Sequence, residues 1–262
     1  MLLWLLFFVL GLAIGSFLNV VILHTHEGAS LWRGRSRCAS CHILIRAYDL
    51  VPVLSFLWLR GRCRGCHQPF SWQYPLVELA TGLLFVAAFW HVFGFTSLPL
   101  WTAETILMLV RNLVLLSFLM ILFVYDLGFG ELPDRFTIPA IVIAFVLNLF
   151  LGQAWPSLLA GALVIGGFFL AQWLVSKKRW VGDGDIRLGV LMGAALGLWA
   201  GLIALWLAYV VGAIVAIFLL RFGKAGWKTQ LPFGTFLTAA TLFVLFFGEL
   251  IWESYLLLFL RF

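Results

Sequence analysis

The chain alternates long apolar segments with short basic ones, and this alternation limits the folds open to it. A helix that crosses the hydrocarbon core of a bilayer needs roughly 17–25 mostly apolar residues. Helices of that kind are expected at residues 1–23, 76–95, 105–125, 136–152, 157–175 and 235–256. Because only 11% of the residues are charged and 64% are hydrophobic, lipid suits most of the surface better than water. The sequence predicts an all-α polytopic membrane protein.

One further apolar stretch, residues 186–221, is awkwardly long for one crossing and tight for two. Basic residues precede it at 177–179 and at Arg187, and Arg221 follows it. If basic loops stay on the cytoplasmic side, the chain must cross twice here and turn near Gly197 to Gly201. The total then becomes about eight transmembrane helices.

The Lys and Arg residues fall almost entirely on one side of this eight-helix topology. The loops after the first, third, fifth and seventh helices, with the adjoining helix ends, hold 15 of the 17. Only Arg111 and Arg261 fall elsewhere. Because basic loops stay inside, we expect these loops in the cytoplasm and both termini in the periplasm. The net charge of +6 then reflects topology, and no nucleic-acid partner is expected.

The predicted topology divides the chain into three parts. Residues 1–23 are expected to form a retained first transmembrane helix, since no basic region precedes them and no small-residue cleavage site follows. Residues 24–74 form a polar cytoplasmic loop that holds all four cysteines, and residues 75–262 form a seven-helix membrane core. A loop of about 50 residues buries little apolar surface, so we expect it to need a stabilising cross-link such as a bound metal.

Two Cys-x-x-Cys-His units lie in this loop, at residues 38–42 and 63–67. Two such pairs can hold one tetrahedral Zn²⁺ through four thiolates, which predicts a structural zinc site at Cys38, Cys41, Cys63 and Cys66. The same pattern attaches c-type haem, and paired dithiols can also serve redox chemistry. Haem is attached outside the membrane, however, and a reducing cytoplasm favours zinc over disulfides. Zinc is the leading interpretation, and a membrane c-type cytochrome is the alternative.

Two aspartates lie at helix ends that border the cytoplasmic loops. Asp126 closes the third helix, and Asp185 opens the sixth. Two carboxylates held close together share a proton, so one can act as a base toward water and the other as an acid, as in an aspartic protease. A cap is the commoner role for Asp at a helix start; it fits Asp134 and could explain Asp185. No capping role is expected for Asp126, because a carboxylate at a helix C-terminus opposes the macrodipole.

Other residues in the apolar segments are further candidates. Glu78, just inside the second helix, is expected to pair with a loop cation or to meet the substrate. Gly182 and Gly184 would let backbone approach closely beside Asp185. Asn19 is expected to hydrogen-bond a neighbouring helix. An ion-coupled transporter would also use intramembrane acids, but it should show inverted repeats, and we find none in the sequence.

Together these motifs resemble the type IV prepilin peptidase family, which combines prepilin leader peptidase with N-methyltransferase activity and carries a Gly-x-Gly-Asp motif. The matching segments run in order from about residue 11 to residue 236: Gly15–Val21, Arg35–Cys41, Tyr48–Pro52, Leu59–Cys66, Tyr74–Glu78, Asp126–Leu127, Leu132–Asp134, Gly182–Asp185 and Pro232–Gly234. The resemblance implies catalytic aspartates at Asp126 and Asp185, zinc-type cysteines in the loop and an eight-helix architecture.

The activity implied is that of an aspartic endopeptidase of the bacterial inner membrane. It would remove the basic leader from type IV prepilin or pseudopilin precursors, which serve type IV pili or type II secretion. A second reaction would methylate the new N-terminus with S-adenosylmethionine. The chain departs from the family's usual residues at Ala39 (usually Pro), His42 and His67 (Gly), Arg62 and Arg187 (Lys) and Thr235 (Pro).

Overall fold

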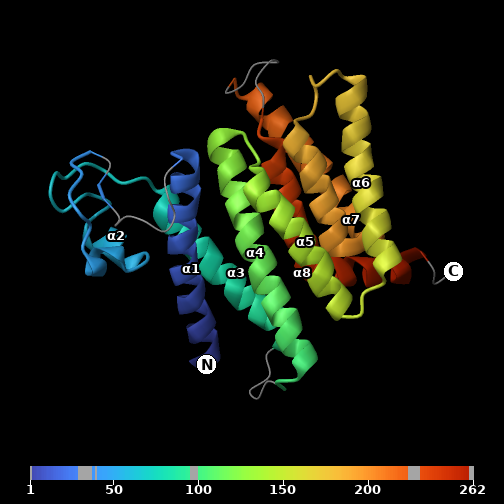
Figure 1. Cartoon of the computed structure of the whole chain (residues 1–262), viewed down its shortest axis with the longest axis horizontal. Coiled ribbons are helices and arrows are strands. Elements are labelled where there is room, and N and C mark those ends of the chain that lie inside the picture. Colours follow the sequence, from blue (N-terminus) through green and yellow to red (C-terminus); the bar gives the residue numbers. More distant parts are fainter. Residues whose placement is uncertain (1, 29–36, 39, 95–99, 224–230, 260–262) are drawn as a thin grey trace. The chain divides into compact units, whose positions relative to one another are not determined.

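A computed structural model describes residues 2–28, 37–38, 40–94, 100–223 and 231–259 (Figure 1). Arg35, Ala39 and Arg261, which were named above, lie outside these ranges. The described part of the chain is helical, with two isolated β-bridges and no strand. Its elements are α1 (Leu2–His26), the 3₁₀ turn η1 (Ala47–Leu50), α2 (Leu54–Trp58), α3 (Gln73–Phe93), α4 (Ala103–Phe129), α5 (Asp134–Phe150), α6 (Trp155–Val175), α7 (Asp183–Arg221) and α8 (Phe233–Phe259). The all-α prediction is confirmed.

Five of these helices are long and apolar enough to cross a membrane: α1, α3, α4, α6 and α7. α5 has 17 residues, and the part of α8 with described side chains, Phe233–Gly248, is shorter than a full span. The chain divides into two compact units, residues 1–101 and 102–262. Each unit is described by itself.

In the first unit, α1 packs against α3 through glycines. A Cβ atom on Gly11 would lie 2.7 Å from the Cα of Gly82, and one on Gly15 would lie 2.7 Å from the Cα of Glu78. Small residues let the backbones of membrane helices approach this closely, where lipid offers no hydrophobic drive for association. One turn later, the side-chain amide of Asn19 donates to the carbonyl of Tyr74 at 3.1 Å, as the sequence predicts.

In the second unit, α6 and α7 make an even closer contact. A Cβ atom on Gly193 would lie 2.0 Å from the carbonyl carbon of Gly161, and one on Gly161 would lie 2.7 Å from the carbonyl carbon of Gly197. Gly189 faces Phe169 of α6 in the same way, at 2.7 Å. The contact therefore depends on glycines spaced four residues apart along α7.

Gly197 divides α7 into two segments. Its φ of 77° and ψ of −174° are not helical, and this left-handed φ favours glycine. A Cβ atom on Gly201 would lie 3.7 Å from the Cα of Gly193, although residues eight apart in a straight helix lie about 12 Å apart. The chain therefore folds back on itself at Gly197. The turn predicted near Gly197 to Gly201 is confirmed.

Polar side chains satisfy the backbone groups that this turn leaves without helical partners. The Asn148 amide of α5 donates to the carbonyls of Ala194 and Ala195, both at 2.9 Å. The Ser157 hydroxyl of α6 accepts the Leu198 N–H at 3.2 Å. Arg111 of α4 holds Asn148 in place by donating to its Oδ1 at 3.0 Å. The end of the unit that carries the turn is thus tied together by hydrogen bonds.

Gly193→Ala is expected to lower the free energy of unfolding by about 1–3 kcal/mol, because the added methyl group would overlap the backbone of Gly161. Thermal unfolding in detergent micelles measures the loss. Gly167→Ala is the matched control on α6, since a Cβ atom there meets no atom within 4 Å. Equal melting temperatures for the two variants would contradict the close α6–α7 contact.

Candidate active site and cysteine cluster

Asp126 lies in the last turn of α4 and is buried, with 5% of its surface exposed. Its Oδ2 accepts the backbone N–H of Thr235, in the first turn of α8, at 2.6 Å. The positive end of the α8 dipole therefore faces this carboxylate. The expectation that no capping role explains Asp126 is wrong, because Asp126 caps a helix other than its own.

Asp185 lies in the first turn of α7. Its Oδ2 accepts the N–H of Gly182 at 3.1 Å, so the capping role considered for Asp185 is present. Residues beside both carboxylates meet Leu132: Gly184 precedes Asp185, and Gly234 lies against the Asp126 Oδ2. The second unit thus brings together two aspartates from separate helices, each at the N-terminal end of a helix.

Leu132 fills the space between the starts of α7 and α8. A Cβ atom on Gly184 would lie 2.8 Å from the Leu132 Cβ. One on Gly234 would lie 2.8 Å from the Asp126 Oδ2 and 3.0 Å from the Leu132 Cδ1. Close approach therefore requires glycine at 184, as expected, and also at 234, which sequence reasoning did not single out as a site residue. At Gly182 the nearest atom would lie at an ordinary 3.6 Å, so no close approach requires glycine there.

The two neighbouring aspartates have a different partner. Asp183 pairs with Arg187 at 3.1 Å, and Asp134 pairs with the same guanidinium. The expectation that Asp134 caps α5 is wrong, because the N-cap residue is Pro133 and no side chain caps that end. Arg187 thus binds both neighbours, whereas Asp126 and Asp185 accept backbone N–H groups.

Glu78 belongs to the first unit and is buried in α3. Its Oε2 accepts the backbone N–H of Val53, in the loop, at 2.8 Å. The loop partner of this carboxylate is therefore a backbone N–H and not the loop cation that was one of the two expectations. Val53 has a φ of 60°, a left-handed conformation that a β-branched residue seldom adopts. Glu78 therefore ties the loop to α3 at a strained position.

The four cysteines come together in the loop of the first unit. The Sγ atoms of Cys38 and Cys66 are 3.7 Å apart, those of Cys41 and Cys63 are 3.9 Å apart, and all four lie within 4.8 Å of one another. A zinc–sulfur distance of about 2.3 Å gives a tetrahedron with edges of about 3.8 Å. The cluster therefore fits one ion of this size. Two separately attached haems would not require the two pairs to converge.

The two Cys-x-x-Cys units have the same backbone geometry. The N–H of Cys38 donates to the carbonyl of Ile43, and that of Cys63 donates to the carbonyl of Gln68. His42 and His67 follow each pair with φ of 56° and 59°. This left-handed conformation suits glycine best, and it is more common for His than for most other residues. Backbone N–H groups of Cys41 and Ser40 bond the Cys38 sulfur and lower its pKa to about 6. Burial and the neighbouring sulfurs raise the pKa of Cys41, so Cys38 is the thiol of this pair that favours the thiolate form a metal binds.

Comparison with known proteins places both units in one family. Residues 9–92 match the Bacterial Peptidase A24 N-terminal domain, and residues 113–217 match the Type IV leader peptidase family. No solved structure matches the chain.

Relatives from several bacteria carry the name prepilin leader peptidase/N-methyltransferase. The Aeromonas hydrophila protein is 36% identical over 98% of this chain and 96% of its own length. The Stutzerimonas stutzeri protein is 36% identical over 95% of this chain and 92% of its own length. The Myxococcus xanthus protein is 42% identical over 85% of this chain, which spans 65% of that relative. The chain therefore belongs to the type IV leader peptidase family.

Proposed function

We propose that this protein is a prepilin peptidase that cuts the basic leader from type IV prepilin or pseudopilin precursors. The observation that carries the proposal is the placement of two carboxylates, Asp126 and Asp185, around Leu132 where α7 and α8 begin, in a unit that contains membrane-spanning helices. The names of the relatives support the same activity. They do not support the alternatives, a c-type cytochrome or an ion-coupled transporter.

The proposed reaction is hydrolysis by an aspartate dyad. The ionised carboxylate removes a proton from a water molecule, whose oxygen attacks the scissile carbonyl. The protonated carboxyl then gives its proton to the nitrogen as the C–N bond breaks. The helix N-terminus beside each aspartate favours its charged form, and the proximity of the two disfavours double ionisation. Cleavage by this route needs no covalent intermediate.

The location proposed is the bacterial inner membrane, with both termini in the periplasm and the aspartates at the cytoplasmic face. The basic loops support this orientation. A substrate with a cationic leader and one apolar helix would keep its leader in the cytoplasm and place its helix in the bilayer. The scissile bond between them would then reach the depth of the two aspartates.

A structural Zn²⁺ is proposed at Cys38, Cys41, Cys63 and Cys66, where it would join the two halves of the loop. The N-methyltransferase named for the relatives supports a second reaction at the new N-terminus with S-adenosylmethionine as methyl donor. We propose that reaction on the names alone.

Asp126→Asn and Asp185→Asn should each lower the cleavage rate by about 10²–10⁴-fold or more, because an amide cannot serve as a general base or acid. The amide oxygen can still accept the N–H groups of Thr235 and Gly182, so folding should be preserved. The measurement is cleavage of a pilin precursor by the variant in membranes, normalised to folded protein.

Asp183→Asn and Asp134→Asn are the matched controls and should retain substantial activity. Their side chains are 76% and 55% exposed, and exposed ion pairs contribute about 0–1 kcal/mol. If Asp183→Asn is inactive while Asp185→Asn still cuts, the assignment of the dyad is wrong. Near wild-type rates in all four variants would refute the aspartic-protease mechanism.

Purified protein should contain one zinc per chain and no iron, as measured by elemental analysis. Cys63→Ser should lose the zinc and make the loop sensitive to protease, because a structural metal supplies folding energy directly. His67→Gly should keep the metal, since it leaves the thiols in place and relieves the left-handed φ. Loss of a haem spectrum on changing His67, or a metal-free protein with a resistant loop, would contradict the zinc site.

A further inference from the structure

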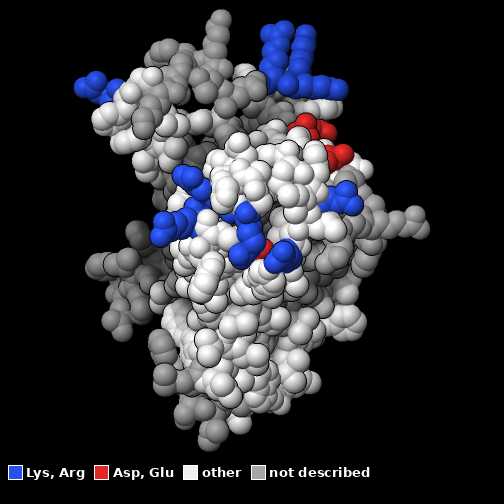
Figure 2. Space-filling model, turned by 90° about the vertical axis from the view of Figure 1, so that its left-hand side faces the viewer, with Lys and Arg blue, Asp and Glu red and all other residues white. Residues whose placement is uncertain are grey.

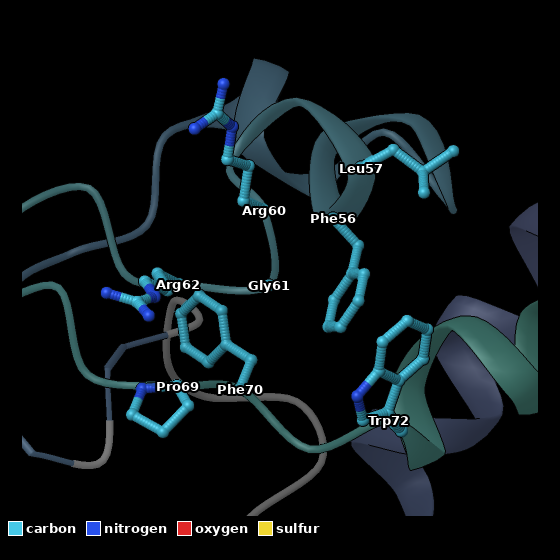
Figure 3. Close-up of a pocket in the computed structure, with 8 residues that line it drawn as sticks. All are labelled: Phe56, Leu57, Arg60, Gly61, Arg62, Pro69, Phe70 and Trp72. Carbon is cyan, nitrogen blue, oxygen red and sulfur yellow. The ribbon is translucent and has the colours of Figure 1, made fainter.

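The short helix α2 exposes an apolar face. Leu54, Leu57 and Trp58 are 66%, 60% and 83% exposed, and their spacing of three and four residues places them on one side of the helix. Phe56 points away from that side, because its ring packs 4.9 Å from the ring of Trp72 (Figure 3). The helix is therefore fixed to the loop by Phe56 and presents its other apolar side chains outward.

The depth of α2 beside the membrane-spanning helices follows from two hydrogen bonds in the first unit. The Asn19 side chain donates to the carbonyl of Tyr74, at the start of α3. Asn19 lies seven residues before the end of α1 at His26, so α3 starts about 10 Å from that end, measured along α1. The N–H of Val53 bonds Glu78, in the second turn of α3. α2 begins at the next residue, so it starts beside the first turns of α3 and not above the end of α1.

This depth corresponds to the boundary between headgroups and acyl chains. α1 has 25 residues and is about 37 Å long, whereas the hydrocarbon core of a bilayer is about 30 Å thick. The headgroup region adds roughly 5–8 Å on each side. With the start of α1 at the far edge of the hydrocarbon core, its other end extends about 7 Å past the near edge, so a segment about 10 Å below that end lies about 3 Å inside the edge. Trp side chains are enriched at this level in membrane proteins.

The positive charge of the loop that contains α2 favours anionic lipids. The described part of the loop that contains α2 carries five exposed Arg residues, namely Arg37, Arg46, Arg60, Arg62 and Arg64, and Arg60 and Arg62 closely follow α2 in the sequence. In Figure 2, blue Lys and Arg side chains are more widespread than red Asp and Glu side chains. Asp49 is already paired with Arg64 at 2.6 Å. A basic peptide would be repelled here, whereas an anionic headgroup would be attracted.

We propose that α2 is an interfacial anchor that binds the anionic phospholipid surface of its own membrane. Leu54, Leu57 and Trp58 lie among the upper acyl chains, and Arg60 and Arg62 reach the phosphates of the headgroups. The helix thereby holds the cysteine-containing loop against the bilayer. This role is separate from cleavage and does not depend on the proposed peptidase activity.

The test is photo-crosslinking of the full-length protein in nanodiscs of phosphatidylcholine with or without phosphatidylglycerol. p-Benzoylphenylalanine replaces Trp58 in one variant and Leu57 in a second, in case one of them folds poorly. Both probes should form adducts with lipid, detected by mass spectrometry. The control probe replaces Gln68, an exposed polar residue of the same loop, and should form little lipid adduct.

Arg60→Gln, combined with the probe at 58, should reduce the preference for phosphatidylglycerol adducts by about fivefold, the effect of one cation near an anionic surface. Adducts with protein in place of lipid at positions 57 and 58 would show that another chain or segment covers α2, and would overturn the proposal. Lipid adducts no more frequent than at position 68 would also overturn it. An unchanged lipid preference in Arg60→Gln would refute the role of that arginine.

Discussion

The hydrogen bond from the Thr235 N–H to Asp126 meets a requirement that governs the whole molecule. The backbone groups at helix ends have no partner within the helix, so where they are buried away from water other protein groups must bind them. The same requirement is met at the turn of α7, where Asn148 binds two carbonyls and Ser157 binds an N–H. Glu78 likewise binds a backbone group at a helix end by accepting the N–H of Val53, where α2 begins. Asp126, Asn148 and Glu78, all buried, thus bind backbone groups where a helix begins or reverses.

The candidate site is a consequence of this requirement. Asp126 can be buried because the start of α8 supplies an N–H and a positive dipole end. Glycines at 184 and 234 then allow the starts of α7 and α8 to close on Leu132, which brings Asp185 to the same end of the unit. The residues that satisfy the backbone and those proposed for the chemistry are thus the same. A carboxylate in this position is stable without a cation, and the cation Arg187 binds the neighbouring Asp134 and Asp183.

The helices, the turn at Gly197 and the convergence of the cysteines could be predicted because each depends on local or repeated features. Segment length sets the number of crossings, basic residues set their direction, and paired Cys-x-x-Cys spacing indicates a shared ion. The partner of Asp126 could not be predicted, since Thr235 lies 109 residues away and the pairing depends on how two helix ends pack. For the same reason Asp134 was expected to cap its own helix, whereas it pairs with Arg187 of α7. Tertiary contacts override local capping preferences where helix ends meet.

Thr235 illustrates how one residue can alter such a contact. The family resemblance implies proline as the usual residue at this position, and proline has no N–H. The third residue of a helix has no partner for its N–H within the helix, so α8 can form with either residue. With threonine, however, the N–H exists and must be satisfied, and Asp126 satisfies it. The threonine hydroxyl also donates to the carbonyl of Pro232 at 2.6 Å, which fixes the entry into α8. Relative to a proline-containing chain, the Asp126 carboxylate of this protein has gained a backbone donor, and its orientation depends on the start of α8.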